Sequence, residues 1–259
     1  MHAHRVSVSV VIPAYNERKT IREILRRVKR SARDLEIIIV DDGSTDGTRS
    51  ILKEYAGDPQ VRVILQPENG GKGRALRTGF MAATKDVVLV QDADLEYDPD
   101  DYETLLGPLD HGRADVVYGS RFQYGARRAL SFRHALGNKL LTFVSNLFTD
   151  LNLTDMETCY KAFKREIIQN IELRSDRFGF EPEITAKIAR LGCVVYEVPV
   201  RYYGRSHTEG KKITWKDGIA AFWHIVRFSI GDRRFTKDAE TIRRVLISQP
   251  QIPEAGSEP

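Results

Sequence analysis

Short runs rich in Val, Ile and Leu alternate with amphipathic helical stretches along the first 120 residues, and this alternation leaves few folds open. Four runs have the composition of buried strands, namely residues 7–12, 36–40, 61–65 and 87–90. The stretches between them carry apolar residues at helical spacing, as at Ile21, Ile24 and Val28. Alternation at intervals of roughly 25–30 residues predicts an α/β protein with a single doubly wound, mostly parallel sheet flanked by helices.

The second half of the chain continues this pattern less regularly. Strands are expected at 115–118 and 194–202, and amphipathic helices at 132–151 and 215–230. After Gly231 the pattern weakens, and the last ten residues contain three prolines. We therefore expect one domain over residues 1–231, followed by a partly disordered C-terminal helix or tail over 232–259.

Three carboxylates, Asp92, Asp94 and Glu96, follow the run at 87–90 directly. We expect this segment to be extended, so that alternate residues share a face and the three acids point the same way, just past the carboxyl end of the strand. Ligands bind at that edge of open α/β sheets. Like charges held this close repel each other unless a cation neutralises them. Because hard oxygen ligands suit Mg²⁺ or Mn²⁺, the sequence predicts a divalent metal site.

The loops after the first two strands also carry acids, at Glu17, Asp41 and Asp42. In a parallel sheet these loops meet at one edge, where Asp41 or Asp42 is placed to accept hydrogen bonds from ribose hydroxyls. The dinucleotide fingerprint G-x-G-x-x-G does not follow the first strand. The glycines at 70–73 lack the spacing and the Ser/Thr of a phosphate loop. Hydride transfer and ATP hydrolysis are therefore disfavoured.

Composition and charge exclude several other classes of protein. The net charge of +4 is too small to indicate a nucleic-acid partner. No apolar stretch approaches the roughly 20 residues that span a bilayer. The N-terminal residues lack the apolar core of a signal peptide, so a cytoplasmic location is expected. The two cysteines, Cys159 and Cys193, match no metal-site spacing and are expected to be free thiols.

Five motifs occur in an order that resembles the inverting family 2 glycosyltransferases of the GT-A fold. They are residues 10–17 (VVIPAYNE), 40–47 (VDDGSTDG), 69–75 (NGGKGRA), 92–94 (DAD) and 119–121 (GSR). The pattern is similar to the polyprenyl-phosphate branch, the dolichyl-phosphate mannose and glucose synthase group, which residues 154–161 and 178–183 also resemble. The resemblance covers about residues 5–230. It implies a Rossmann-like nucleotide-sugar-binding half, an acceptor half and a catalytic domain over 1–231.

The resemblance also implies roles on the side of the sugar donor. Contacts to the nucleotide sugar are implied for Pro13, Tyr15, Glu17, Asp42, Lys72, Asp92 and, when its loop closes on the diphosphate, Lys211. Asp92 would touch both metal and sugar, and Asp94 would be the main metal ligand. Glu96 stands where relatives often have Gln and would also lie near the metal.

A lipid-phosphate acceptor brings negative charge toward a negatively charged donor, and guanidinium groups hold phosphate with two parallel hydrogen bonds. By the resemblance, Arg121, Arg133 and Arg205 would hold that phosphate, with Arg128 as the alternative to Arg133. A phosphate oxygen is already ionised at neutral pH, so no general base is required. Catalysis would then rest on positioning and charge neutralisation, and the sugar would transfer with inversion in one displacement.

Two other functions stay open from the sequence. A glycosyltransferase acting on a soluble or saccharide hydroxyl needs a general base, for which Glu181 and Glu183 are candidates. With a phosphate acceptor, these two acids would be structural instead. The other function is an inert nucleotide-sugar-binding module, against which the intact Asp92 and Asp94 argue. The donor is GDP-mannose, UDP-glucose or UDP-N-acetylglucosamine, and the oligomeric state stays open.

Contact with a membrane is the last question that the sequence raises. The helix expected at 215–230 carries aromatic residues that either pack in the core or lie in a membrane interface: Trp215, Phe222, Trp223 and Phe228. Residues 121–139 contain five Lys or Arg and no acid, which suits phosphates or an anionic surface. Family members often carry transmembrane helices after this point and this sequence does not. We therefore expect peripheral contact with the cytoplasmic face of a membrane.

Overall fold

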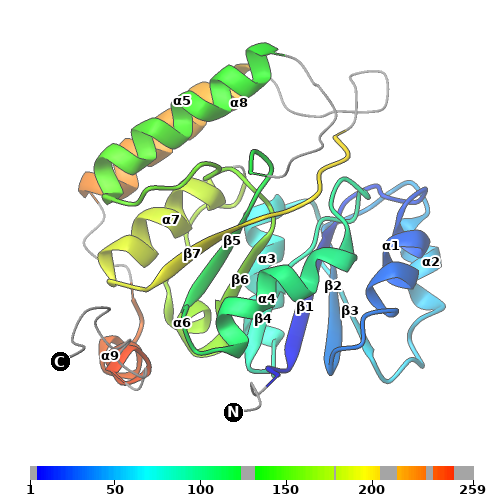
Figure 1. The fold of residues 1–259 in the computed structure, drawn as a ribbon. Coiled ribbons are helices and arrows are strands. Elements are labelled where there is room, and N and C mark those ends of the chain that lie inside the picture. Colours follow the sequence, from blue (N-terminus) through cyan, green and yellow to red (C-terminus); the bar gives the residue numbers. More distant parts are fainter. Residues whose placement is uncertain (1–4, 124–131, 178, 205–214, 232–235, 248–259) are drawn as a thin grey trace.

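The computed structural model describes residues 5–123, 132–177, 179–204, 215–231 and 236–247 (Figure 1). In this part of the chain one seven-stranded sheet has the order β3-β2-β1-β4-β6-β5-β7. The strands are β1 (Val8–Ala14), β2 (Leu35–Asp41), β3 (Val61–Leu65), β4 (Val87–Val90), β5 (Val116–Ser120), β6 (Lys161–Lys164) and β7 (Val195–Pro199). All neighbours pair in parallel except β6, which runs antiparallel to β4 and β5. The predicted mostly parallel α/β sheet is confirmed.

Helices cover both faces of this sheet (Figure 1). They are α1 (Ile21–Val28), α2 (Thr48–Lys53), α3 (Lys72–Ala82), α4 (Tyr102–Asp110), α5 (Phe132–Thr149), α6 (Arg165–Asn170), α7 (Phe180–Arg190), α8 (Trp215–Val226) and α9 (Ala239–Ile247). Helix α3 packs on β1 and β2, and α4 packs on β5, β6 and β7. Helices α5 and α8 pack on each other and on α7, so they form a layer outside the main body (Figure 1).

The first strand continues through Pro13, where the sequence predicted its end. Strand β4 pairs with β1 only as far as Val90, which lies opposite Val11. The amide of Gln91 then donates to the carbonyl of Val11, so the backbone N–H and C=O groups of the odd-numbered residues of β1 point toward β4. Pro13 therefore stands just past the β4 ladder, where its missing N–H costs no hydrogen bond.

Strand β6 was not predicted from the sequence, and neither were the helices α6 and α7. The strand has only four residues, and Lys161 at its start is fully buried. The Lys161 ammonium donates to the carbonyls of Met156 and Thr158 and lies 4.7 Å from the centre of the Tyr118 ring. These partners replace the water that a lysine normally requires, and no pattern along the chain reveals them.

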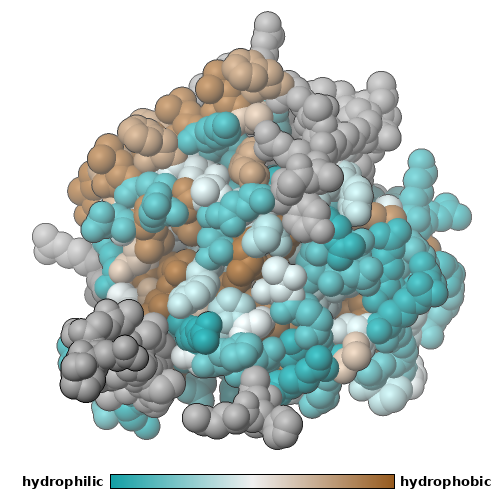
Figure 2. Space-filling view, viewed as in Figure 1, coloured by the Kyte–Doolittle hydropathy of each residue, from teal (hydrophilic) through white to brown (hydrophobic). Residues whose placement is uncertain are grey.

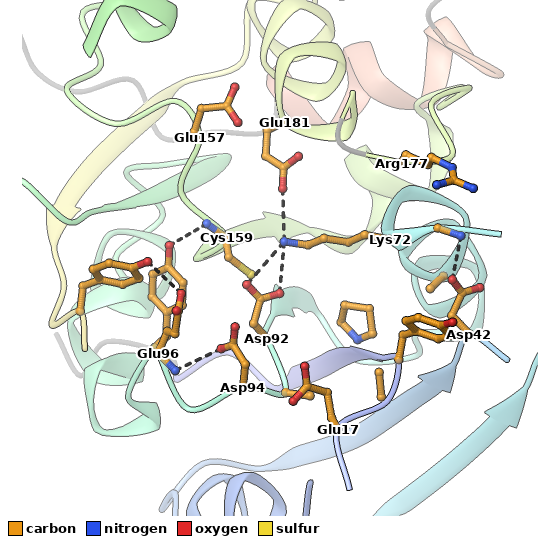
Figure 3. A pocket seen from close by; sticks show the side chains of 18 of the residues that line it. Glu17, Asp42, Lys72, Asp92, Asp94, Glu96, Glu157, Cys159, Arg177 and Glu181 are labelled. Carbon is orange, nitrogen blue, oxygen red and sulfur yellow. Dashed lines mark hydrogen bonds and ion pairs between the residues drawn. The ribbon is translucent and has the colours of Figure 1, made fainter. Parts of the chain in front are cut away.

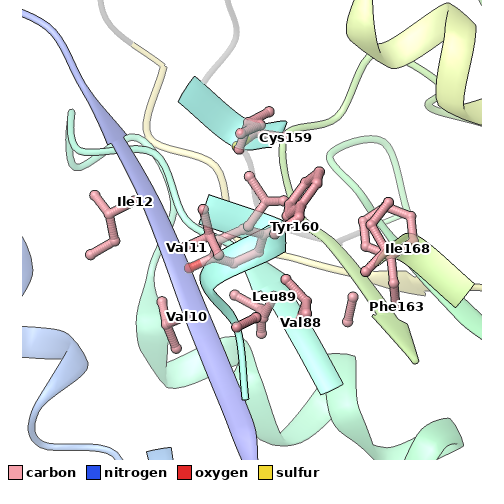
Figure 4. Close-up of a cluster of buried hydrophobic side chains, with 14 of the residues drawn as sticks. Val10, Val11, Ile12, Val88, Leu89, Cys159, Tyr160, Phe163 and Ile168 are labelled. Atoms are coloured by element: carbon pink, nitrogen blue, oxygen red, sulfur yellow. The ribbon is translucent and has the colours of Figure 1, made fainter. Parts of the chain in front are cut away.

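The core joins the strands that end at the functional edge of the sheet. Figure 4 shows one cluster that contains Val10 and Val11 of β1, Val88 and Leu89 of β4, and Phe163 of β6. All five side chains are fully buried. Each contributes about 1.5–3 kcal/mol of burial free energy. The carboxyl ends of β1 and β4 are therefore held at a fixed separation.

Two features of the outer layer concern membranes. Within the described residues, no helix combines the length and the apolar character that crossing a bilayer requires. The aromatic residues predicted for the last long helix have different environments, since Phe228 is buried while Phe222 and Trp223 are exposed. The side chain of Trp215 lies outside the described part of the chain.

Candidate functional site

A cavity of about 440 Å³ lies at the carboxyl edge of the sheet (Figure 3). It is lined by Pro13, Tyr15, Glu17, Asp42, Lys72, Asp92, Asp94, Glu96 and Arg121, which the sequence analysis assigned to donor, metal and acceptor. Pro13 belongs to β1, and the other residues follow β1, β2, β4 and β5 or begin α3. The topology therefore brings together side chains that lie up to 108 positions apart, from Pro13 to Arg121.

Three predicted residues and one alternative cannot be placed at this cavity. Arg205 and Lys211 lie outside the described residues, as does the alternative Arg128. Arg133 belongs to α5, but its side chain is also outside the described part. The roles of these residues stay predictions.

The acidic segment after β4 is a turn, so the prediction of an extended segment was wrong. Leu95 has a φ of 66°, in the left-handed region. The Asp94 carboxylate accepts a hydrogen bond from the amide of Glu96 at 3.1 Å, which closes the turn. Short acidic side chains favour such turns because they replace a backbone acceptor. The turn keeps Asp92, Asp94 and Glu96 at the cavity, where Glu96 also accepts from the Tyr202 hydroxyl at 2.8 Å.

The carboxylates fit a divalent cation whose coordination the substrate completes. Among the described residues, no three His, Cys, Asp or Glu side chains come close enough to form a metal site by themselves. Asp92 and Asp94 nevertheless present hard oxygen atoms at the cavity. Mg²⁺ commonly takes one or two protein carboxylates and fills its remaining positions with phosphate oxygens and water.

Lys72 places a positive charge among these acids (Figure 3). Its ammonium lies 3.1 Å from Asp92 Oδ1 and 3.3 Å from Glu181 Oε1. Burial is the strongest single influence and would lower the pKa of Lys72, but the nearby Asp92 and Glu181 carboxylates, together with Cys159, outweigh it and hold this pKa well above its ordinary value. Lys72 is therefore cationic at neutral pH, and it links Asp92 to Glu181 of α7.

Asp42 shapes the glycine loop that precedes α3. Its two carboxylate oxygens accept hydrogen bonds from the amides of Gly70, at 2.9 Å, and Gly71, at 2.7 Å. Gly71 has a φ of 97°, and a Cβ atom there would overlap the carbonyl oxygen of Asp176. The sequence left open whether Asp41 or Asp42 faces the ligand. Asp41 is fully buried in an ion pair with Arg49, so Asp42 is the one at the cavity.

Arg121 is oriented on the other side of the cavity by Asp155. Its Nε and Nη2 each donate to an Asp155 oxygen at 2.6 Å, and Nη2 also lies 3.2 Å from Asn138 Oδ1. The guanidinium stacks over the Tyr202 ring, with its carbon 5.2 Å from the ring centre. Burial would lower the pKa of Arg121, yet the fully buried Asp155 carboxylate raises it well above the ordinary value. The cation is thus fixed in position and charge.

The structure separates the two candidate general bases. Glu183 is fully buried, accepts from the amides of Arg174 and Ser175, and forms an ion pair with Lys187. These partners give Glu183 a structural role. Glu181 lines the cavity and pairs with Lys72, so it keeps contact with any ligand there.

Other cavity residues received no role from the sequence, including Glu157, Cys159, Arg177 and Tyr202. Residues 154–161 resembled the polyprenyl-phosphate branch, which was the available signal for the first two. Burial and the nearby Glu181 carboxylate raise the pKa of the Glu157 carboxyl above its ordinary value.

Comparison with known proteins agrees with this geometry. The family model described as Glycosyl transferase family 2 matches residues 9–172. The chain is 32% identical over 205 residues to the polyprenol monophosphomannose synthase of Mycolicibacterium smegmatis, covering 76% of this chain and 77% of the relative. It is 30% identical over 247 residues to the undecaprenyl-phosphate mannosyltransferase of Micrococcus luteus, covering 86% and 99%.

A solved structure shows the same fold. Glucosyl-3-phosphoglycerate synthase from Mycobacterium tuberculosis, crystallised with Mn²⁺, UDP and phosphoglyceric acid, superposes with a TM-score of 0.68. The alignment has 22% identity and covers 88% of this chain and 80% of that one. With the motifs in order around one cavity, and with the family model spanning more than half of its residues, this chain belongs to glycosyltransferase family 2 and has the GT-A fold.

Proposed function

We propose that this protein transfers a hexose from a nucleotide sugar to the phosphate of a polyprenyl phosphate, with inversion at the anomeric carbon. The observation that carries the proposal is the fixed guanidinium of Arg121, which faces the same cavity as Asp92, Asp94 and Lys72. A cation on the side away from the glycine loop suits an anionic acceptor. The names of the two curated relatives specify mannose transfer to polyprenyl or undecaprenyl phosphate, which supports the same acceptor class here.

On the donor side, the nucleotide would lie against the residues that follow β1 and β2, including Tyr15, Glu17 and Asp42. The diphosphate would then reach Asp94 and Lys72. A divalent cation, Mg²⁺ or Mn²⁺, held by Asp92 and Asp94 would neutralise the diphosphate as it leaves. Lys72 adds a second positive charge that is already in place before the substrate binds.

On the acceptor side, Arg121 would hold the phosphate so that one oxygen faces the anomeric carbon. That oxygen is ionised at neutral pH and forms the new bond without giving up a proton. The bond from the anomeric carbon to the diphosphate oxygen breaks, and the nucleoside diphosphate departs with the electron pair. Catalysis then consists of alignment and charge neutralisation.

Glu181 supports a second candidate function. It is an acid at the cavity, 3.3 Å from the Lys72 ammonium, and it could accept the proton of a hydroxyl acceptor. With this acceptor the protein would be a glycosyltransferase acting on a soluble or saccharide hydroxyl.

We also propose that the outer layer of helices rests on the membrane that contains the acceptor. Helix α5 carries an apolar stripe whose side chains are each more than half exposed: Phe132, Leu136, Leu140, Phe143 and Leu147. Their spacing of three or four residues places them on one face of the helix. Trp223 belongs to α8, which packs on α5, and is 63% exposed; Figure 2 shows the apolar band over α5. Exposed apolar bands of this kind mark interaction surfaces.

Helix α5 connects this band to the cavity. His134 lines the cavity, while Phe132 and Leu136, two positions away on either side, belong to the exposed stripe. One polyprenyl phosphate molecule would therefore place its phosphate in the cavity and its prenyl chain along the apolar band. Peripheral contact with the cytoplasmic face is the arrangement that we propose.

The test is transfer of label into lipid. Purified protein is incubated with Mg²⁺ or Mn²⁺, a short polyprenyl phosphate and labelled GDP-mannose, UDP-glucose or UDP-N-acetylglucosamine, and then extracted with organic solvent. We expect label in the organic phase with one donor, which also identifies the sugar. Absence of lipid label, together with nucleotide release when a soluble hydroxyl acceptor is added, would instead establish the second candidate.

A further inference from the structure

A short segment, residues 155–159, connects the two ends of the cavity. Asp155 at its start holds Arg121, on the acceptor side. Cys159 at its end places its thiol against the carboxylate of Asp92, on the metal side (Figure 3). Glu157 lies midway between them and also lines the cavity. Along the chain, Glu157 therefore stands between the residue that holds Arg121, proposed to bind the acceptor, and the residue that contacts Asp92, proposed to bind the metal.

The Glu157 carboxyl has an unused hydrogen-bonding atom. Its Oε1 is buried and has no hydrogen-bond partner in the described part of the chain. A buried polar atom left in this state costs about 1–3 kcal/mol, so native proteins rarely retain one without a reason. Because the residue faces a cavity, a ligand hydroxyl is the partner that would remove this cost.

The charges around Glu157 favour its neutral form. Glu181 and Asp155 are the nearby acids, and Lys161 and Arg121 are the nearby cations. Burial and Glu181 raise the pKa of Glu157 more than the two cations lower it. A neutral carboxyl offers one O–H donor and one carbonyl acceptor, which matches the two roles of a sugar hydroxyl. It also adds no repulsion toward the two phosphate-bearing substrates.

We propose that Glu157 is a specificity-determining residue that hydrogen-bonds a hydroxyl group of the transferred hexose. This inference rests on the proposed function, because the hexose must lie between leaving diphosphate and attacking phosphate for the displacement to occur. A site that pairs a buried polar group with a substrate hydroxyl rejects analogues that lack the hydroxyl. Glu157 would thus help to select which sugar is used.

The experiment compares donor binding in wild type, Glu157→Ala and Glu157→Gln by calorimetry with Mn²⁺ present. Ligands are the nucleotide sugar, the same nucleoside diphosphate without sugar, and the monodeoxy forms of the nucleotide sugar. We expect Glu157→Ala to weaken nucleotide-sugar binding about tenfold and nucleoside diphosphate binding less than about twofold. The monodeoxy donor that lacks the hydroxyl bound by Glu157 should bind Glu157→Ala as tightly as the parent donor does, because this variant has already lost that hydrogen bond. Glu157→Gln should stay within about threefold of wild type, since an amide also donates and accepts.

Three outcomes would overturn the inference. Equal weakening of nucleotide sugar and nucleoside diphosphate would assign Glu157 a structural role. Additive losses with every monodeoxy donor would show that it touches none of the hydroxyls. An effect seen only when polyprenyl phosphate is added would place it on the acceptor. The exposed Glu166, on α6 and away from the cavity, supplies the matched control Glu166→Ala.

Two different experiments test the proposed function and the role of Glu157. If no donor gives lipid label, the acceptor proposal fails. The binding comparison needs no acceptor and still decides the role of Glu157.

Discussion

Asp155 holds Arg121 by two hydrogen bonds of 2.6 Å, and the carboxylate is completely buried while the guanidinium still reaches the cavity. Asp155 therefore binds the Nε and Nη2 edge of the guanidinium and holds the rest of the group in position for a ligand. Removing one partner of a buried ion pair costs about 3–5 kcal/mol, so a variant of Arg121 must keep the charge to stay folded.

Arg121→Lys keeps the positive charge but loses the planar donor pair. We expect KM for polyprenyl phosphate to rise roughly tenfold, because an ammonium cannot hold phosphate with two parallel bonds. The Kd for the nucleotide sugar should stay unchanged, since we propose that Arg121 binds the acceptor and not the donor. Unchanged acceptor kinetics would remove Arg121 from the acceptor site.

Asp94→Ala tests the proposed metal site. In the described structure, the Asp94 carboxylate accepts the Glu96 amide, a bond whose loss leaves the sheet intact. We expect turnover to fall at least about 100-fold, together with loss of the Mn²⁺ dependence of donor binding. Asp100→Ala, at an exposed acid on the same connection, is the control and should retain both. An Asp94→Ala enzyme that turns over normally and still responds to chelation would place the metal elsewhere.

Gly71→Ala tests the loop that Asp42 holds. A left-handed φ of 97° and overlap with the Asp176 carbonyl require the loop to move, which costs about 1–3 kcal/mol. We expect weaker binding of the nucleoside diphosphate and a lower melting temperature. Gly107→Ala in α4 is the control: a Cβ there meets nothing within 4 Å, so this helix should become more stable by about 0.5–1 kcal/mol. Equal effects of the two substitutions would show that the loop geometry is not required.

Glu157→Gln should change how stability depends on pH. Burial and Glu181 raise the folded-state pKa of this carboxyl above its ordinary 4.5. Above that ordinary value the folded chain binds more protons than the unfolded chain, so the free energy of unfolding falls as pH rises. The amide does not titrate. Urea unfolding should therefore give similar stabilities near about pH 4 and a more stable variant near about pH 8. A difference that is constant over this range would mean that Glu157 titrates normally.

Phe143→Ser combined with Leu147→Ser tests the apolar band. Both side chains are mostly exposed on α5, so folding should be unaffected while sedimentation with anionic vesicles falls at least about tenfold. Met81→Ser, at an exposed apolar residue of α3, serves as the control and should not change sedimentation. Equal vesicle binding by the wild type, the double variant and Met81→Ser would show that the apolar band does not bind the membrane.

The sequence predicted the features that depend on a single strand and the loop that follows it. The runs at 61–65 and 87–90 predicted β3 and β4 with the bounds that the structure shows. Strand β4 is buried throughout, as a strand covered on both faces is, whereas β3 is an edge strand that leaves Arg62 and Leu65 exposed. Tyr15, Glu17 and Asp42 lie at the cavity because they come after the carboxyl ends of β1 and β2, and their contacts with a sugar donor stay predictions.

Features that depend on contacts between distant segments could not be predicted. Strand β6 forms because Met156, Thr158 and Tyr118 surround the Lys161 ammonium. The turn after β4 forms because the Asp94 side chain captures a backbone amide, which overrides the alternation of an extended segment. Glu157 reaches the cavity only through the ion pair and thiol contact at the two ends of its segment.

The antiparallel insertion of β6 has a consequence for synthesis on the ribosome. Strand β4 is complete at Val90, but its second neighbour begins at Lys161, about 70 residues later. Until that stretch emerges, the growing chain presents four consecutive apolar residues, Val87–Val90, on an open sheet edge, the template on which other chains aggregate. The nascent protein thus passes through an interval in which its donor half is nearly formed and its central strand is unprotected.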